Sequence, residues 1–464
     1  MSKRTWLLVT ILGSLCLGLG LLATVAALDL LGPRPTATLA LSSAVPESTP
    51  TSAPSRTTAV LTAPAALAGP SAEVRAEMTE IEAQVVLLRG LEPTGPVERR
   101  LLTTEELRHH VLNELLEDYS REESEDEARL LTLLGLLPPG FDLWGLYADL
   151  YTEQLAGYYD FEAQEMVIVR GQGFEGPQRL TYAHEYVHAL QDQRFDLESG
   201  LSMNDEACDR EAERCAAMRS LLEGDATLLE SQWRRTYASE DDLRELEAFY
   251  ATFESPVFLS APNFLQVDFL FPYTYGLEFV RQLYLDGSWP AVDEAYAAPP
   301  QSTEQILHPA RYPEDVPIAL QTPALLPALG AGWREIERGV MGEWTTRLAL
   351  MGYLAEETAV TAAEGWGGDF FLAFYHPRFG GALVWLTQWD SLRQAEEAYS
   401  AFRDFGDARF GDHTATATFT VQWSIPDTFA HLERQSLQSL WIQAPDAAAA
   451  TALRQAIDFP APVP

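Results

Sequence analysis

The stretch LTYAHEYVHALQDQ, residues 180–193, contains the pentad His184-Glu185-Tyr186-Val187-His188. Apolar residues recur through it at helical spacing, so the stretch predicts a helix with one apolar face. Residues four apart project from the same side of a helix, so both imidazoles can reach one metal ion with Glu185 beside them. The alternative is an ordinary helix that contains two incidental histidines.

Zinc suits the ligands that this part of the chain offers. Two neutral imidazoles and one carboxylate leave a fourth position for a water molecule, whose pKa zinc lowers toward neutrality. The best third ligand is Glu223 in LLEGDA, on a second predicted helix 35 residues past His188. Gly224 has no side chain and would let that helix approach the first closely. Asp225 is a rival ligand, but it lies about 200° around the helix from Glu223, so both do not easily face one ion.

The two motifs, His-Glu-x-x-His and a later Glu-Gly-x-Ala, resemble those of the gluzincin metallopeptidases, the clan of thermolysin. The resemblance covers about residues 150–290. It implies that His184, His188 and Glu223 bind zinc and that Glu185 is the general base. The Gly-Ala-Met-Glu-Asn type of motif is absent upstream, so aminopeptidase specificity is not supported.

The chain departs from the clan in two further ways. The spacing of 35 residues between His188 and Glu223 is longer than is usual there. Thermolysin-like enzymes carry an aspartate four residues past the ligand glutamate, whereas Thr227 occupies that position here. The partner that orients His184 must then come from elsewhere, and Asp225 is the candidate.

Three other segments fit the same resemblance. The strand EMVIV, residues 165–169, stands where clan members place an edge strand that binds an extended peptide, although a strand packed on the core is an equal alternative. Tyr273 in PYTYG takes the position of the oxyanion-stabilising tyrosine of the clan's aminopeptidases. His308, in a loop before a proline, is a second possible donor, although such a histidine is more often structural.

Charge narrows the classes of partner. The 464 residues carry a formal net charge of -37. A surface of this sign repels nucleic acid and anionic lipid headgroups, so neither is expected to bind the folded part. A peptide or protein substrate is the expected partner, and the sequence leaves the oligomeric state open.

The N-terminal region differs in composition from the rest. Lys3 and Arg4 precede a charge-free run from Trp6 to Leu28, which is 23 residues long and sufficient to span a bilayer. Residues 1–31 therefore predict a single-pass membrane anchor with the folded part outside the cytoplasm. A cleaved signal and a secreted body are the alternative. Residues 32–72 are rich in Pro, Ser, Thr and Ala and predict a linker.

Periodicity in the remainder predicts an α+β protein of two domains. Residues 73–319 are expected to form a helix-rich zincin-like domain with a small β-sheet, and residues 320–464 a C-terminal α+β domain in which strands such as GALVWLTQW pack on helices. Cys208 and Cys215 would lie about 10 Å apart in one continuous helix, too far to bridge. A disulfide between them therefore requires Cys208 to precede the helix.

The expected function is zinc-dependent hydrolysis of peptide bonds. Because the exopeptidase motif is missing, we expect the enzyme to cleave internal bonds. Two other classes stay open. One is a binding or scaffold protein on a zincin fold that has lost turnover, which the intact Glu185 argues against. The other is a zinc hydrolase that acts on a non-peptide bond, because specificity depends on pocket shape rather than on the motif.

Overall fold

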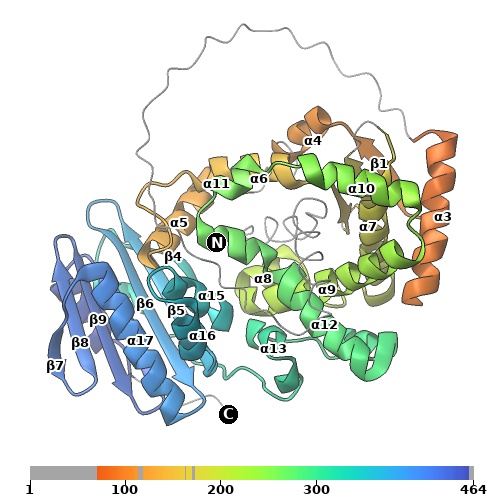
Figure 1. The fold of residues 1–464 in the computed structure, drawn as a ribbon. Coiled ribbons are helices and arrows are strands. Elements are labelled where there is room, and N and C mark those ends of the chain that lie inside the picture. Colours follow the sequence, from red (N-terminus) through yellow and green to blue (C-terminus); the bar gives the residue numbers. More distant parts are fainter. Residues whose placement is uncertain (1–69, 113–118, 162, 170–172, 459–464) are drawn as a thin grey trace, which may run out of the picture.

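The computed structural model describes residues 70–112, 119–161, 163–169 and 173–458. The α+β class is confirmed: a helix-rich part holds one small sheet, and a large antiparallel sheet follows it (Figure 1). The helices are α3 (Ala72–Arg89), α4 (Thr104–His110), α5 (Arg121–Leu133), α6 (Leu143–Gln154), α7 (Gly176–Phe195), α8 (Asp205–Arg210), α9 (Ala212–Thr236), α10 (Glu240–Thr252), α11 (Pro256–Ser260), α12 (Asn263–Ala297), α13 (Thr303–Leu307), α14 (Leu326–Leu329), α15 (Gly342–Met351), α16 (Glu356–Ala363), α17 (Leu392–Phe410) and α18 (Ala447–Gln455).

The strands form two separate sheets. They are β1 (Glu98–Leu102), β2 (Gly157–Asp160), β3 (Glu165–Val169), β4 (Arg334–Gly339), β5 (Trp366–His376), β6 (Gly380–Trp389), β7 (Thr414–Ala417), β8 (Thr420–Ile425), β9 (Thr428–Gln435) and β10 (Gln438–Ala444). The small sheet has the order β1-β3-β2, and the large one has the order β4-β5-β6-β10-β9-β8-β7.

The small sheet decides between the two alternatives for residues 165–169, an edge strand and a strand packed on the core. Strands β2 and β3 form a hairpin, with antiparallel pairing from Gly157 opposite Ile168 to Asp160 opposite Glu165. However, β1 pairs in parallel with the other side of β3, so β3 is the central strand and not an edge. The sequence of β1 is charged and lacks strict alternation, which is why sequence periodicity did not reveal it.

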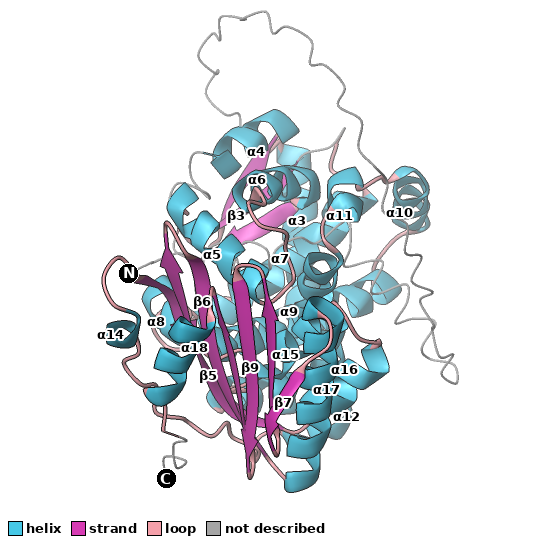
Figure 2. Ribbon diagram, turned by 90° about the vertical axis from the view of Figure 1, so that its left-hand side faces the viewer, coloured by secondary structure: helices cyan, strands magenta, loops and turns pink. Residues whose placement is uncertain are grey.

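The central strands of the large sheet (β5, β6 and β10) are buried on both faces because their side chains alternate between two cores. Phe371, Trp385 and Trp441 belong to a core shared with α15, α16 and α17. Leu372 and Val384 belong to the opposite core, which includes residues of α14 and α18. Figure 2 shows α18 on the left of the large sheet and α17 on its right. The first core also includes Leu133 and Leu134 at the end of α5, so the helix-rich part and the large sheet share apolar side chains.

The predicted membrane topology is corrected. No helix in the described ranges combines the length and the apolarity that crossing a bilayer requires. This finding contradicts the prediction of a single-pass membrane protein. The run from Trp6 to Leu28 and nearly all of the predicted linker lie outside the described residues.

Candidate metal centre

Helix α7 carries the pentad in the interior of the helix-rich part. Pro177 occupies the first turn, where a missing backbone N–H costs nothing. Asp196 ends the helix in the left-handed conformation, with φ of 53°. All residues from Leu180 to Asp192 are buried, so the pentad does not lie on an exposed helix face.

Three predicted ligands come together at one point. One nitrogen of each of His184 and His188 and one carboxylate oxygen of Glu223 all lie within 4.8 Å of one another. Glu223 Oε2 lies 3.2 Å from His184 Nε2 and 3.5 Å from His188 Nε2. These two nitrogens and a carboxylate are a ligand set that zinc prefers.

The outer nitrogens of both histidines are held by polar side chains. His184 Nδ1 donates to Glu230 Oε2 at 3.0 Å. His188 Nδ1 donates to Gln191 Oε1 at 2.8 Å, and Gln191 is itself oriented because its Nε2 donates to the Leu222 carbonyl at 3.1 Å. With Nδ1 engaged in this way, Nε2 of each histidine is the nitrogen that faces Glu223 and that a metal ion would bind.

The prediction that Asp225 orients His184 is wrong. Asp225 accepts hydrogen bonds from Arg89 Nε at 2.8 Å, Arg89 Nη2 at 3.0 Å and the Tyr296 hydroxyl at 2.8 Å. It therefore belongs to a buried ion pair on another side of α9 and is not a member of the metal group. Glu230, which sequence reasoning missed, lies seven residues after Glu223, two helical turns along the same face.

The electrostatic field at the centre favours a cation. Burial lowers the pKa of the His184 imidazole, but the Glu223 and Glu230 carboxylates outweigh it and raise that pKa to about 10. Burial raises the pKa of Glu223, and the two neighbouring imidazoles more than offset this, so that the pKa falls below its ordinary value. Positive charge at this point is thus stabilised by the protein, which suits a divalent metal ion.

Two glycines bring α9 and α12 into backbone contact beside the centre. A Cβ at Gly224 would stand 2.1 Å from the Gly276 carbonyl oxygen, and a Cβ at Gly276 would stand 2.1 Å from the Ser220 carbonyl oxygen. Only glycine fits at either position. The predicted close approach at Gly224 is therefore present, but toward α12 rather than toward the pentad helix.

The two predicted oxyanion donors have different surroundings. Tyr273 is buried on α12, one turn before Gly276, and interacts electrostatically with Arg219 of α9. His308 Nε2 lies 3.0 Å from both carboxylate oxygens of Glu343 and 3.3 Å from Arg347 Nη2. The described contacts of His308 thus tie it to α15, and it is not one of the residues that the structure groups around the metal position.

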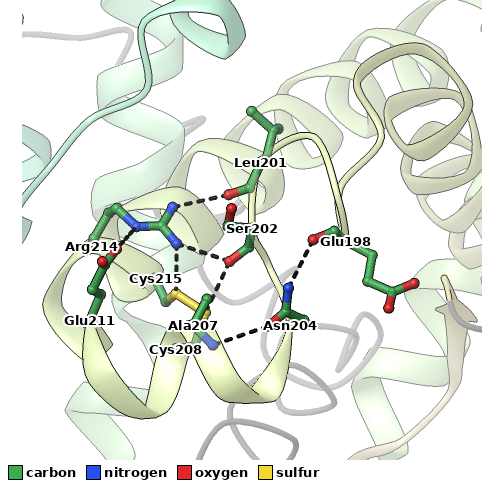
Figure 3. The surroundings of a disulfide bond; sticks show 9 residues. All are labelled: Glu198, Leu201, Ser202, Asn204, Ala207, Cys208, Glu211, Arg214 and Cys215. Atoms are coloured by element: carbon green, nitrogen blue, oxygen red, sulfur yellow. Dashed lines mark hydrogen bonds and ion pairs between the residues drawn. A yellow bond between two sulfur atoms is a disulfide. The ribbon is translucent and has the colours of Figure 1, made fainter.

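A disulfide joins Cys208 and Cys215, a bond that the sequence left open. Cys208 lies on α8 and Cys215 on α9, and Glu211 separates the two helices with non-helical φ and ψ of -129° and 46°. The Cα atoms are 5.6 Å apart, which a single continuous helix would not allow (Figure 3). The break at Glu211 is therefore what permits the bond.

Comparison with known proteins gives one match. A family described as a domain of unknown function, DUF8575, matches residues 330–454, which contain the large sheet. No curated protein and no solved structure matches the chain. The resemblance to gluzincins stays an expectation from the two motifs.

Proposed function

We propose that this protein is a zinc-dependent metallopeptidase that cleaves internal peptide bonds. The observation that carries the proposal is the convergence of His184 Nε2, His188 Nε2 and a Glu223 oxygen within 4.8 Å, with the other nitrogen of each histidine fixed by a polar partner. Helix periodicity alone explains why the histidines are neighbours, but not why Glu223 and Glu230 from another helix meet them.

The residues around the centre support hydrolysis rather than metal storage. A zinc ion held by the three ligands would acidify a water molecule and polarise a carbonyl group. Glu185 follows His184 in the buried pentad and serves as the general base that takes the proton of the attacking water. It then returns the proton to the leaving amine, and Tyr273 is the proposed donor to the oxyanion.

Zinc content and peptide cleavage test the proposal together. We expect one zinc per purified chain, and its loss in His184→Ala, His188→Ala and Glu223→Ala. Glu185→Gln should keep its zinc but lower the rate of peptide cleavage by about a hundredfold to ten-thousandfold, because the amide does not accept the proton. A chelator should abolish cleavage by the wild type.

Each outcome separates the proposal from its alternatives. Cleavage by Glu185→Gln at the wild-type rate would rule out the general-base role. A wild type that holds zinc but cleaves no member of a proteome-derived peptide mixture would instead favour a binding protein or a hydrolase of another bond. A full zinc content in His184→Ala would remove the pentad from the metal site.

A further inference from the structure

Arg219 is a cation next to the metal group that the mechanism above does not use. It lies on α9 four residues before Glu223, so the two side chains project from the same face, with Cβ atoms about 5–6 Å apart. The contact between Ser220 and Gly276 places α12 directly against this turn of α9. Arg219 therefore belongs to the wall of the centre formed by α9 and α12.

Two of the three guanidinium nitrogens of Arg219 have no hydrogen-bond partner among the described residues. Its side chain is partly exposed, yet Nε and Nη2 are shielded from solvent and make no hydrogen bond within the described part of the chain. Arg89, at the end of α3, differs in that two of its nitrogens form a bidentate pair with Asp225, although its Nη1 also lacks a partner in the described part of the chain. A shielded charged donor without a partner is costly, and such a group in a native protein calls for a functional explanation.

The acidic groups near Arg219 interact with other residues. Its electrostatic neighbours are Glu223, Asp268, Tyr273 and Tyr151. Glu223 faces the two histidines, and Asp268 accepts a hydrogen bond from Trp344 Nε1 at 2.7 Å. Burial lowers the pKa of the Arg219 guanidinium to about 10, which leaves it positively charged at neutral pH. A metal ion on Glu223 would offset the charge of that carboxylate and leave less negative charge beside the guanidinium, which favours the binding of an anion there.

We propose that Arg219 binds a carboxylate of the substrate close to the scissile bond. The inference rests on the proposed peptidase function and names its substrate class: peptides with an acidic side chain, or a free C-terminal carboxylate, at that position. A guanidinium binds a carboxylate through two parallel hydrogen bonds, and Nε and Nη2 form one such edge. Because the whole molecule carries a charge of -37, its overall field repels anionic peptides, so the preference must arise locally.

Matched peptides test this selectivity. Starting from one peptide that the wild type cleaves, glutamate is compared with glutamine at each position beside the scissile bond, and a C-terminal acid is compared with the amide. We expect kcat/KM to be about tenfold to a hundredfold higher for the carboxylate at one position, because charge-assisted pairs in shielded sites contribute that much. The position that responds distinguishes a side-chain carboxylate from a C-terminal one.

Variants of Arg219 show whether this residue causes the preference for a carboxylate. Arg219→Met should reduce the ratio of kcat/KM values to about one, and Arg219→Lys should leave an intermediate ratio because lysine is a single-point donor. Arg281→Met is the control, since Arg281 is an exposed α12 residue paired with Glu278 at 2.8 Å, and it should not change the ratio. The melting temperature of Arg219→Met should be no lower than that of the wild type, because the substitution removes no described hydrogen bond or ion pair.

A second readout separates this inference from the peptidase proposal. The same fluorescently labelled peptides are titrated into zinc-loaded Glu185→Gln, with and without Arg219→Met, and Kd is measured by anisotropy. A carboxylate preference that Arg219→Met removes would support the role of Arg219 even if the wild type cleaves nothing. An unchanged ratio in Arg219→Met, or an equal fall for both peptides of a pair, would overturn it.

Discussion

At the scale of single residues, the ligands were predictable and their partners were not. The spacing of His184 and His188 is a property of one helix, so the sequence alone places them together. The choice between Glu223 and Asp225 was harder, because the ion-pair partner of Asp225, Arg89, is 136 residues away along the chain. Glu230 was missed although it repeats the helical period of Glu223, because nothing in the sequence shows which α7 atom it meets.

This division of roles makes a prediction for two neighbouring acids. Glu230→Ala should weaken zinc binding by about tenfold to a hundredfold, because His184 loses the group that fixes its orientation. Asp225→Asn should lower the free energy of unfolding by about 3 kcal/mol, because Arg89 loses its buried partner and keeps only the partly exposed Asp293. It should change zinc affinity far less. Zinc titration measures the affinity of both variants, and urea unfolding measures their stability. If Asp225→Asn weakened zinc binding more than Glu230→Ala, Asp225 and not Glu230 would be the residue that orients His184.

At the scale of elements, the helices and the hairpin around the centre were predictable because each carries a local pattern. For example, Thr103 and Glu106 form a capping box at the start of α4, and this pairing of residue types three apart is a local signal of a helix start. Parallel pairing of β1 with β3 was not predictable, since the two strands are joined through intervening helices and β1 has no apolar alternation. The contact between α9 and α12 was likewise hidden, because a glycine shows that a close approach is possible but not which element approaches.

The glycine contact predicts a coupling between packing and metal binding. Gly276→Ala should lower the free energy of unfolding by about 1–3 kcal/mol, because the methyl group forces α12 away from Ser220. Since Glu223 lies on the displaced turn of α9, zinc affinity should fall as well. Gly95→Ala is the control, because a Cβ there meets nothing within 4 Å. Thermal unfolding and zinc titration check both variants, and wild-type behaviour of Gly276→Ala would disprove the tight crossing.

At the scale of the whole molecule, the sequence predicted a helix-rich region and a strand-rich region but not the contacts that join them. Glu213 of α9 reaches Thr303 of α13, whose backbone N–H and hydroxyl donate to it at 2.6 Å and 2.7 Å. A Cβ at Gly342, which has φ of 74°, would stand 2.2 Å from Glu213 Oε2. Asp369 of β5 accepts from the backbone N–H of Met341 at 2.8 Å and of Gly342 at 3.1 Å. Two buried acids from the two regions thus meet at the start of α15.

This junction should make stability depend on pH. Burial raises the pKa of Glu213 to about 8 and that of Asp369 to about 6, so the folded state holds protons that the unfolded chain releases. Their contribution is complete below the ordinary pKa of a carboxyl group and is lost as pH rises through 6 and then 8. The melting temperature should therefore fall as the pH rises from about 4 to about 8 and level off above that range, which corresponds to a loss of unfolding free energy on the order of a few kcal/mol.

Glu213→Gln isolates this effect. Glutamine keeps a carbonyl oxygen for Thr303 but does not ionise, so its melting temperature should fall less steeply over the same pH range. The measurement is thermal unfolding of both proteins at half-unit pH steps. Parallel curves would show that Glu213 is not the titrating group.

The break at Glu211 also indicates where related proteins can differ in length. The ligands depend on helix turns within α7 and within α9, whereas α8 and the loop before it stand between those helices and contribute none of them. Insertions or deletions between Phe195 and Cys215 would therefore leave the three metal ligands in place. One residue added between Arg219 and Glu230 would instead rotate the side chains after it by about 100° around α9, away from those before it. A search pattern for distant relatives should accordingly fix the spacing of Arg219, Glu223, Gly224 and Glu230 and leave the stretch after the pentad helix free.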